Sequence, residues 1–61
     1  MDPNANLAEQ QWLLTCRRDE RDADDRLVLR ELRAALRGWL DRGGFAPDWT
    51  QYPQAAKYYG H

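Results

Sequence analysis

The sequence contains no serine and has only one cysteine, Cys16, and one histidine, His61. A serine nucleophile is therefore excluded, and the sequence brings no Cys–His pair together. A structural zinc site needs about four Cys, His or acidic ligands at suitable spacing, which this chain does not offer. A single cysteine forms no disulfide within the chain, and its isolation is typical of a reducing compartment. We therefore expect neither an enzyme nor a metal or cofactor site.

Long apolar runs are also missing from the chain. No segment approaches the roughly 18 apolar residues of a membrane-spanning helix. The first residues, MDPNANLAEQ, lack the basic and apolar regions of a signal peptide. The 61 residues are too few for two domains, which rarely fall below about 50 residues each. We expect one small helical domain over residues 1–61, in the cytoplasm and without a membrane partner.

Glycine and proline are absent between Asn4 and Arg37, a stretch rich in good helix formers, which predicts an all-α fold. Residues 17–26, RRDERDADDR, contain no large apolar side chain, so the apolar pattern does not continue through them. We predict a helical hairpin with helices over about 5–20 and 23–42, joined by a turn near residues 22–24. An Asp in this turn caps the second helix, and further Asp residues there suit the helix dipole.

The first helix has a ragged apolar pattern, so its buried face is poorly defined. Asn4 or Asn6 is expected to cap its N-terminus. Cys16 lies near Trp12 and Leu13 in the sequence, and we expect a small buried thiol there.

The second helix carries the clearest pattern in the chain. Its apolar residues recur at i, i+3 and i+4 and form one wide stripe: Val28, Leu29, Leu32, Ala35, Leu36, Trp39 and Leu40. We expect Leu32 and Leu36 to be core residues. Gly43 and Gly44 follow this helix and predict a left-handed C-terminal cap.

The C-terminal tail, residues 43–61, holds five of the seven aromatic residues. We expect it to pack across the hairpin, with Phe45 and Trp49 completing the core. Pro53 can open a short third helix near residues 53–59 that ends at Gly60. For the three tyrosines of the tail, burial and an exposed binding role remain open, and His61 is expected to be a frayed terminus.

The net charge of −1 hides two parts of opposite sign. Residues 1–25 carry three arginines against seven acidic side chains, a balance of −4, whereas residues 26–42 carry five arginines against two, a balance of +3. Such parts can pair with each other, within one chain or between two copies.

One face of the second helix carries four arginines spaced by 4, 3 and 4 residues: Arg26, Arg30, Arg33 and Arg37. This spacing places them within about 60° of one another, and we expect them opposite the centre of the apolar stripe. The pattern is typical of a solvated face, and it also fits contact with an acidic protein surface or with phosphate. Nucleic-acid-binding proteins usually carry an excess of basic residues. The isoelectric point of this chain is near 5.6, which argues against nucleic acid as the partner.

For function, we predict a non-catalytic protein–protein interaction module, acting as an adaptor, inhibitor or assembly subunit. The alternative is a small nucleic-acid-binding regulator that uses the four arginines. We expect the partner to be another protein or a second copy of the chain, the latter in a symmetric homodimer paired through the second helix. The predicted partner-binding residues are four arginines and five aromatic residues: Arg26, Arg30, Arg33, Arg37, Trp39, Trp49, Tyr52, Tyr58 and Tyr59.

Overall fold

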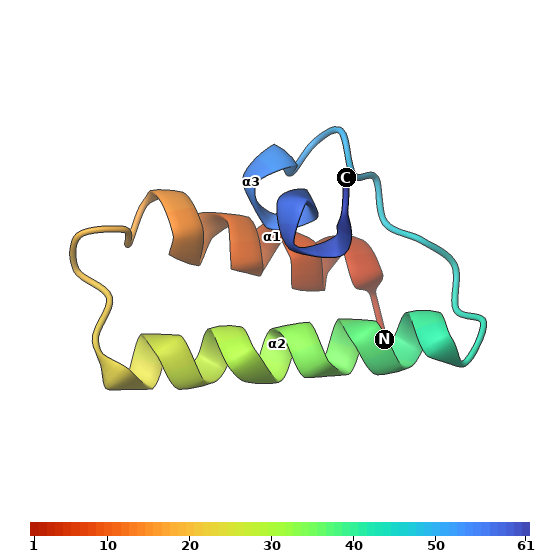
Figure 1. Ribbon diagram of the computed structural model, residues 1–61, viewed down its shortest axis with the longest axis horizontal. Helices are drawn as coiled ribbons and strands as arrows, with labels where there is room; N and C mark the ends of the chain where they lie inside the picture. The colour runs from red at the N-terminus through yellow and green to blue at the C-terminus, as the bar shows by residue number, and fades with distance from the viewer.

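A computed structural model describes all 61 residues and contains helices but no strands, which confirms the all-α prediction. Helix α1 spans Pro3–Thr15, α2 spans Ala23–Asp41, and α3 spans Pro53–Ala56. The single 3-10 turn η1, Lys57–Tyr59, follows α3 directly. Figure 1 shows α1 and α2 side by side and running in opposite directions, with α3 packed against α1. None of these helices combines the length and the apolar character needed to cross a bilayer.

The N-terminus of α1 is capped by Asp2, so the prediction of a cap at Asn4 or Asn6 is wrong. The Asp2 carboxylate accepts hydrogen bonds from the backbone N–H groups of Asn4, at 3.0 Å, and Ala5, at 3.3 Å. Pro3 occupies the first turn of the helix, where its missing N–H costs no hydrogen bond. The two asparagine side chains are instead free to bind other parts of the chain.

Helix α1 ends at Thr15, earlier than the predicted residue 20, and the Cys16 thiol is exposed. The expected burial of Cys16 is therefore wrong. Nine residues, or about two and a half helical turns, separate it from the buried Leu7, so the two side chains point to opposite sides of the helix axis. The sequence neighbours of Cys16 are apolar, but the side of the helix on which it lies is not covered.

Helix α2 begins as predicted, with Asp22 as its cap. The Asp22 carboxylate accepts a hydrogen bond from the backbone N–H of Asp25 at 2.9 Å. The helix ends before Gly43, whose φ of 85° confirms the predicted left-handed cap. Both ends of α2 are therefore determined by local sequence.

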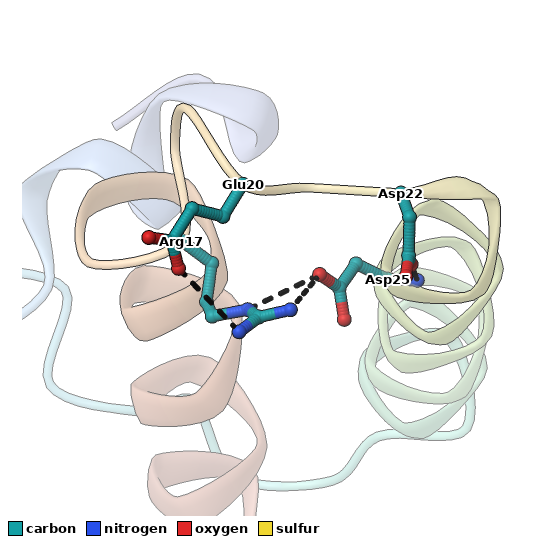
Figure 2. A network of polar contacts seen from close by, with 4 residues as sticks. All are labelled: Arg17, Glu20, Asp22 and Asp25. Carbon is teal, nitrogen blue, oxygen red and sulfur yellow. Dashed lines mark hydrogen bonds and ion pairs between the residues drawn. The ribbon is translucent and has the colours of Figure 1, made fainter.

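An ion pair connects the loop after α1 to the first turn of α2 (Figure 2). Arg17 Nη2 lies 2.8 Å from Asp25 Oδ2, and Arg17 Nη1 lies 3.7 Å from a Glu20 carboxylate oxygen. The hydrogen bond with Asp25 and the charge of that carboxylate raise the pKa of Arg17. The ion pair thus bridges the charged connection between α1 and α2, which contains no large apolar side chain.

The centre of the core is formed by one residue from each of three helices. Leu7 of α1, Leu36 of α2 and Ala55 of α3 are fully buried against one another. Leu32 is only half-buried, so of the two predicted core leucines Leu36 alone lies in the centre. Half-buried apolar residues surround this centre: Leu14, Trp39, Leu40, Trp49, Tyr52 and Tyr59.

The tail contributes to the core through α3 and Trp49, but not through Phe45. The Phe45 side chain is 62% exposed, which corrects the expectation that it completes the core. It follows the end of α2 immediately, and its ring meets the Trp39 ring edge-on at 5.6 Å at the surface. Trp49 is half-buried and packs against the core, as expected.

The short third helix forms as α3 and η1 and ends at Gly60, which has a φ of 86°. His61 is not a frayed terminus. Its ring stacks on Trp49 with a centroid distance of 4.3 Å and an interplanar angle of 6°, and its backbone N–H bonds the Ala56 carbonyl at 3.1 Å. The aromatic rings of the tail thus hold the last residue in place.

Candidate protein-binding groove

The four arginines of α2 lie next to the side of the helix that carries its two buried residues, Leu29 and Leu36, and not on the side opposite them. Arg33 is half-buried, whereas Arg26, Arg30 and Arg37 are exposed. Arg33 and Arg37 lie against the rings of η1, so the tail covers part of this face, which the charge pattern alone suggests is solvated. The position of the tail, which helical periodicity does not reveal, places aromatic rings above this side of α2.

Tyr58 is the aromatic residue at the centre of this arrangement. The Arg33 guanidinium carbon, Cζ, lies 4.2 Å from the Tyr58 ring centroid, and that of Arg37 lies 5.7 Å away. Tyr59 meets the Tyr58 ring edge-on at 5.0 Å. The Tyr58 ring is nevertheless 51% exposed, so its position is fixed by its neighbours while part of it faces solvent.

A groove of about 400 Å³ runs along this side of α2, and we call it the arginine groove. It is lined by four arginines and three apolar or aromatic residues: Arg26, Leu29, Arg30, Arg33, Ala34, Arg37 and Tyr58. The lining includes the buried Leu29 and the exposed Ala34 and Tyr58, so the groove combines an apolar surface with cationic walls.

A second hollow, of about 640 Å³, adjoins the arginine groove and shares Arg33 and Tyr58 with it. Its lining comes from the end of α1, from α2 and from the tail: Leu14, Thr15, Arg18, Arg33, Gln54, Lys57 and Tyr58. The two hollows meet on either side of the Arg33–Tyr58 contact.

The electrostatics of the two hollows are one-sided. Six of the nine cationic side chains of the protein line them, and no carboxylate does: Arg18, Arg26, Arg30, Arg33, Arg37 and Lys57. None of the six forms an ion pair, because both ion pairs of the protein belong to Arg17. In addition, Arg33 Nε is buried and has no hydrogen-bond acceptor. Chemically, this surface is suited to bind anionic oxygen atoms next to an apolar group.

A buried polar network holds η1 in place beneath the groove. The Gln10 side-chain amide, which is fully buried, donates hydrogen bonds to Asn6 Oδ1 at 2.7 Å and to the Tyr59 hydroxyl at 3.0 Å. Asn6 in turn donates to the Leu32 carbonyl at 3.1 Å. Burial raises the pKa of Tyr59, although the hydrogen bond with Gln10 and the nearby Arg33 act in the opposite direction. The network links the backbone of α2, through α1, to the turn that carries Tyr58.

The predicted partner-binding residues therefore separate into two groups. The four arginines and Tyr58 form the groove, and Tyr59 lies behind it. Trp39, Trp49 and Tyr52 are half-buried against the core and line neither hollow. A role of any of these residues in binding a partner stays a prediction.

Sequence reasoning missed several residues of this region. Helical periodicity places Leu29 in the apolar stripe but does not reveal that it lines a groove, and no pattern in the sequence distinguishes Arg18 and Lys57 from other surface cations. Gln10 carried no signal, because a single glutamine in a helix is ordinary until its burial against Tyr59 is known. No group of three or more His, Cys, Asp or Glu side chains lies in an arrangement that could hold a metal ion.

Comparison of the chain with models of protein families, with curated proteins and with solved structures finds no match.

Proposed function

We propose that the protein is a non-catalytic interaction module that binds an acidic segment of a partner protein in the arginine groove. The observation that supports this proposal is the set of six cationic side chains that line two adjoining hollows without a carboxylate partner. Guanidinium groups bind carboxylates with short, charge-assisted hydrogen bonds. A partner segment with carboxylates would supply the acceptors that the groove lacks.

The apolar part of the groove adds a second requirement for the partner. Ala34 and Tyr58 offer exposed apolar surface beside the arginines, and the groove volume of about 400 Å³ suits a large side chain. Tyr and Arg are among the residues that dominate binding energy at protein interfaces. We therefore propose that the segment is amphipathic and places an apolar side chain between acidic ones.

The alternative function is a small nucleic-acid-binding regulator that uses the same arginines. In its favour, the exposed ring of Tyr58 beside two guanidinium groups resembles the platforms on which unpaired bases stack. Against it, the protein has a net charge of −1, and the acidic residues Asp22, Asp24 and Asp25 precede Arg26 directly and would repel a phosphate backbone. They repel an acidic segment as well, but a short segment carries few charges, whereas a polynucleotide carries one at every phosphate, so the repulsion counts more against nucleic acid.

We also propose that the module is a homodimer and acts in the cytoplasm. The apolar stripe of α2 extends beyond what α1 and the tail cover, since Val28 and Ala35 remain exposed. The exposed thiol of Cys16 has no partner in the chain and suits a reducing compartment.

The test uses a fluorescent peptide that repeats glutamate and leucine at helical spacing, with binding followed by anisotropy. A matched peptide with glutamine in place of glutamate, and a single-stranded oligonucleotide, serve as comparisons. We expect the acidic peptide to bind more tightly than both, and Arg30→Glu to weaken it by about tenfold or more, a change of roughly 1.4 kcal/mol. Arg21→Glu makes the same charge change outside the groove and is expected to have a much smaller effect.

Two results would contradict the proposed function. Equal binding of the glutamate and glutamine peptides would show that the cationic groups do not recognise carboxylates. Tighter binding of the oligonucleotide, with affinity that falls steeply with added salt, would favour the nucleic-acid regulator instead.

A further inference from the structure

The flank of α2 opposite the arginine groove carries an uncovered apolar face. Its residues are Val28, Leu32, Ala35 and Trp39, whose spacing places them on one side of the helix. Val28 is 39% exposed and Ala35 is exposed, whereas Leu32 and Trp39 are half-buried where this face meets the core. At about 100° per residue, Ala35 and Arg37 lie on opposite sides of the buried Leu36, so this face and the groove do not overlap. We call it the Val28–Trp39 face.

Trp39 is held rigidly at one end of this face. Its indole Nε1 donates a hydrogen bond to the Phe45 carbonyl at 2.9 Å, and the Phe45 ring packs edge-on against it. Gly44 approaches the indole so closely that a Cβ at this position would lie 2.3 Å from its Cε2 atom. A large aromatic side chain that is already ordered loses little conformational freedom when a partner covers it.

Charges of opposite sign lie at the two ends of the Val28–Trp39 face. Asp24 precedes Val28 by four residues, and Arg42, the C-cap residue just after α2, follows Ala35 by seven, so the two lie on this side at opposite ends of the helix. Both are exposed, and neither takes part in an ion pair. The face is therefore negative at its start and positive at its end, and a third exposed charge, the carboxylate of Glu31, lies on its edge between Val28 and Ala35.

The charged and apolar residues of this face are compatible with one antiparallel register. The midpoint between Asp24 and Arg42 falls at residue 33, and the midpoint between Val28 and Trp39 falls between residues 33 and 34. An identical helix lying antiparallel across this point would set Asp24 opposite Arg42 and Val28 opposite Trp39. Ala35 then lies near the twofold axis, where its small side chain lets the two backbones come close.

We propose that the Val28–Trp39 face is the docking surface for a second copy of this chain, antiparallel to the first, with Asp24 of each copy beside Arg42 of the other. This inference rests on the homodimer of the proposed function and adds its surface and orientation. Because the arginine groove lies on the other flank of α2, both grooves stay open in the dimer. The assembly is therefore bivalent, and a partner with two acidic segments binds it more tightly than a partner with one.

The test measures the dimer dissociation constant of the full chain by sedimentation equilibrium, from low to high micromolar concentration. Asp24→Arg and Arg42→Asp each set like charges opposite one another at two symmetric places in the dimer. We expect each to weaken the dimer by about tenfold, and the double variant to restore it by exchanging the two charges. Arg30→Asp makes the same charge change as Arg42→Asp on the groove flank and is expected to leave the dimer unchanged. Circular dichroism checks that every variant keeps its helices.

The outcomes separate the inference from the proposals on which it rests. A single-chain mass at every concentration overturns both the homodimer and its surface. If neither Asp24→Arg nor Arg42→Asp changes the dissociation constant of the dimer, the antiparallel orientation is wrong. In a parallel pair Asp24 lies opposite Asp24 and Arg42 opposite Arg42, so each single variant only exchanges one pair of like charges for another. Weakening by both single variants without recovery in the double variant also overturns it. Peptide binding in the arginine groove is measured independently of all three results.

Discussion

The Arg33 guanidinium lies over the Tyr58 ring, with Cζ 4.2 Å from the ring centroid, although the two residues belong to the middle of α2 and to the last turn of the chain. An exposed contact of this kind contributes about 0.5–1 kcal/mol. Its larger consequence is geometric, because it brings an aromatic wall to the arginines of α2. A row of cations that would otherwise be a solvated helix face becomes one side of a groove.

Leu36→Ala is expected to destabilise the protein by about 2–5 kcal/mol, because it opens a cavity where three helices meet. The matched control is Leu27→Ala on the same helix, where the side chain is 51% exposed and the expected change is within about 0.5 kcal/mol. Chemical denaturation of both variants measures the difference. Equal stability of the two variants would show that the centre of the core lies elsewhere.

Tyr59→Phe is expected to lower the free energy of unfolding by about 1–3 kcal/mol, because it leaves the buried Gln10 amide without one of its partners. Tyr58→Phe removes a hydroxyl that makes no hydrogen bond within the protein and is expected to change stability by less than about 0.5 kcal/mol. Urea denaturation at neutral pH compares the two. A larger loss in Tyr58→Phe would contradict the role assigned to the Gln10–Tyr59 contact.

The pKa of Tyr59 predicts how its contribution changes in alkaline solution. Burial raises this pKa above the ordinary tyrosine value of about 10, so the unfolded chain loses the proton more readily than the folded one. The contribution of Tyr59 to the free energy of unfolding is therefore fully present below a pH of about 10, and it is lost as the pH rises through the higher pKa of the folded protein. The stability difference between the natural protein and Tyr59→Phe is expected to narrow over this range, as denaturation at two pH values can show. A difference that does not change with pH would contradict the raised pKa.

The Cys16 thiol is expected to react with Ellman's reagent in the folded protein about as fast as in the urea-unfolded chain, because the residue is exposed. The comparison needs no substitution, since the protein has no other cysteine. Slow labelling that becomes fast only after unfolding would show that the thiol is buried.

The features of the fold that could be predicted from sequence are those encoded locally. The apolar stripe of α2, its cap at Asp22 and its left-handed Gly43 depend on residues a few positions apart. The start of α1 was also encoded locally, by an Asp before a Pro. The predicted cap of α1 is wrong because Asn4 and Asn6 are residue types that cap helices as well as Asp2 does. The structure shows that these asparagines bond Asp48 and Leu32, which are distant in the chain.

The candidate site could be predicted only in part, because it depends on where the tail packs. The spacing of the four arginines was readable, but their relation to Tyr58 requires Ala55 to be buried against Leu7 and Leu36. Alanine carries almost no sequence signal for such a position. Likewise, the exposure of Phe45 and the burial of Gln10 follow from contacts between segments that are far apart in the sequence.

The central claim, that the arginine groove binds an acidic amphipathic segment, is tested most directly by NMR with isotopically labelled protein. The glutamate–leucine peptide is titrated into the protein while the amide signals are followed. We predict that the largest shifts occur at Leu29, Arg33 and Tyr58, and that the Trp39 indole signal on the other flank of α2 changes little. Shifts centred on Trp39, or no saturable shifts at all, would contradict the claim.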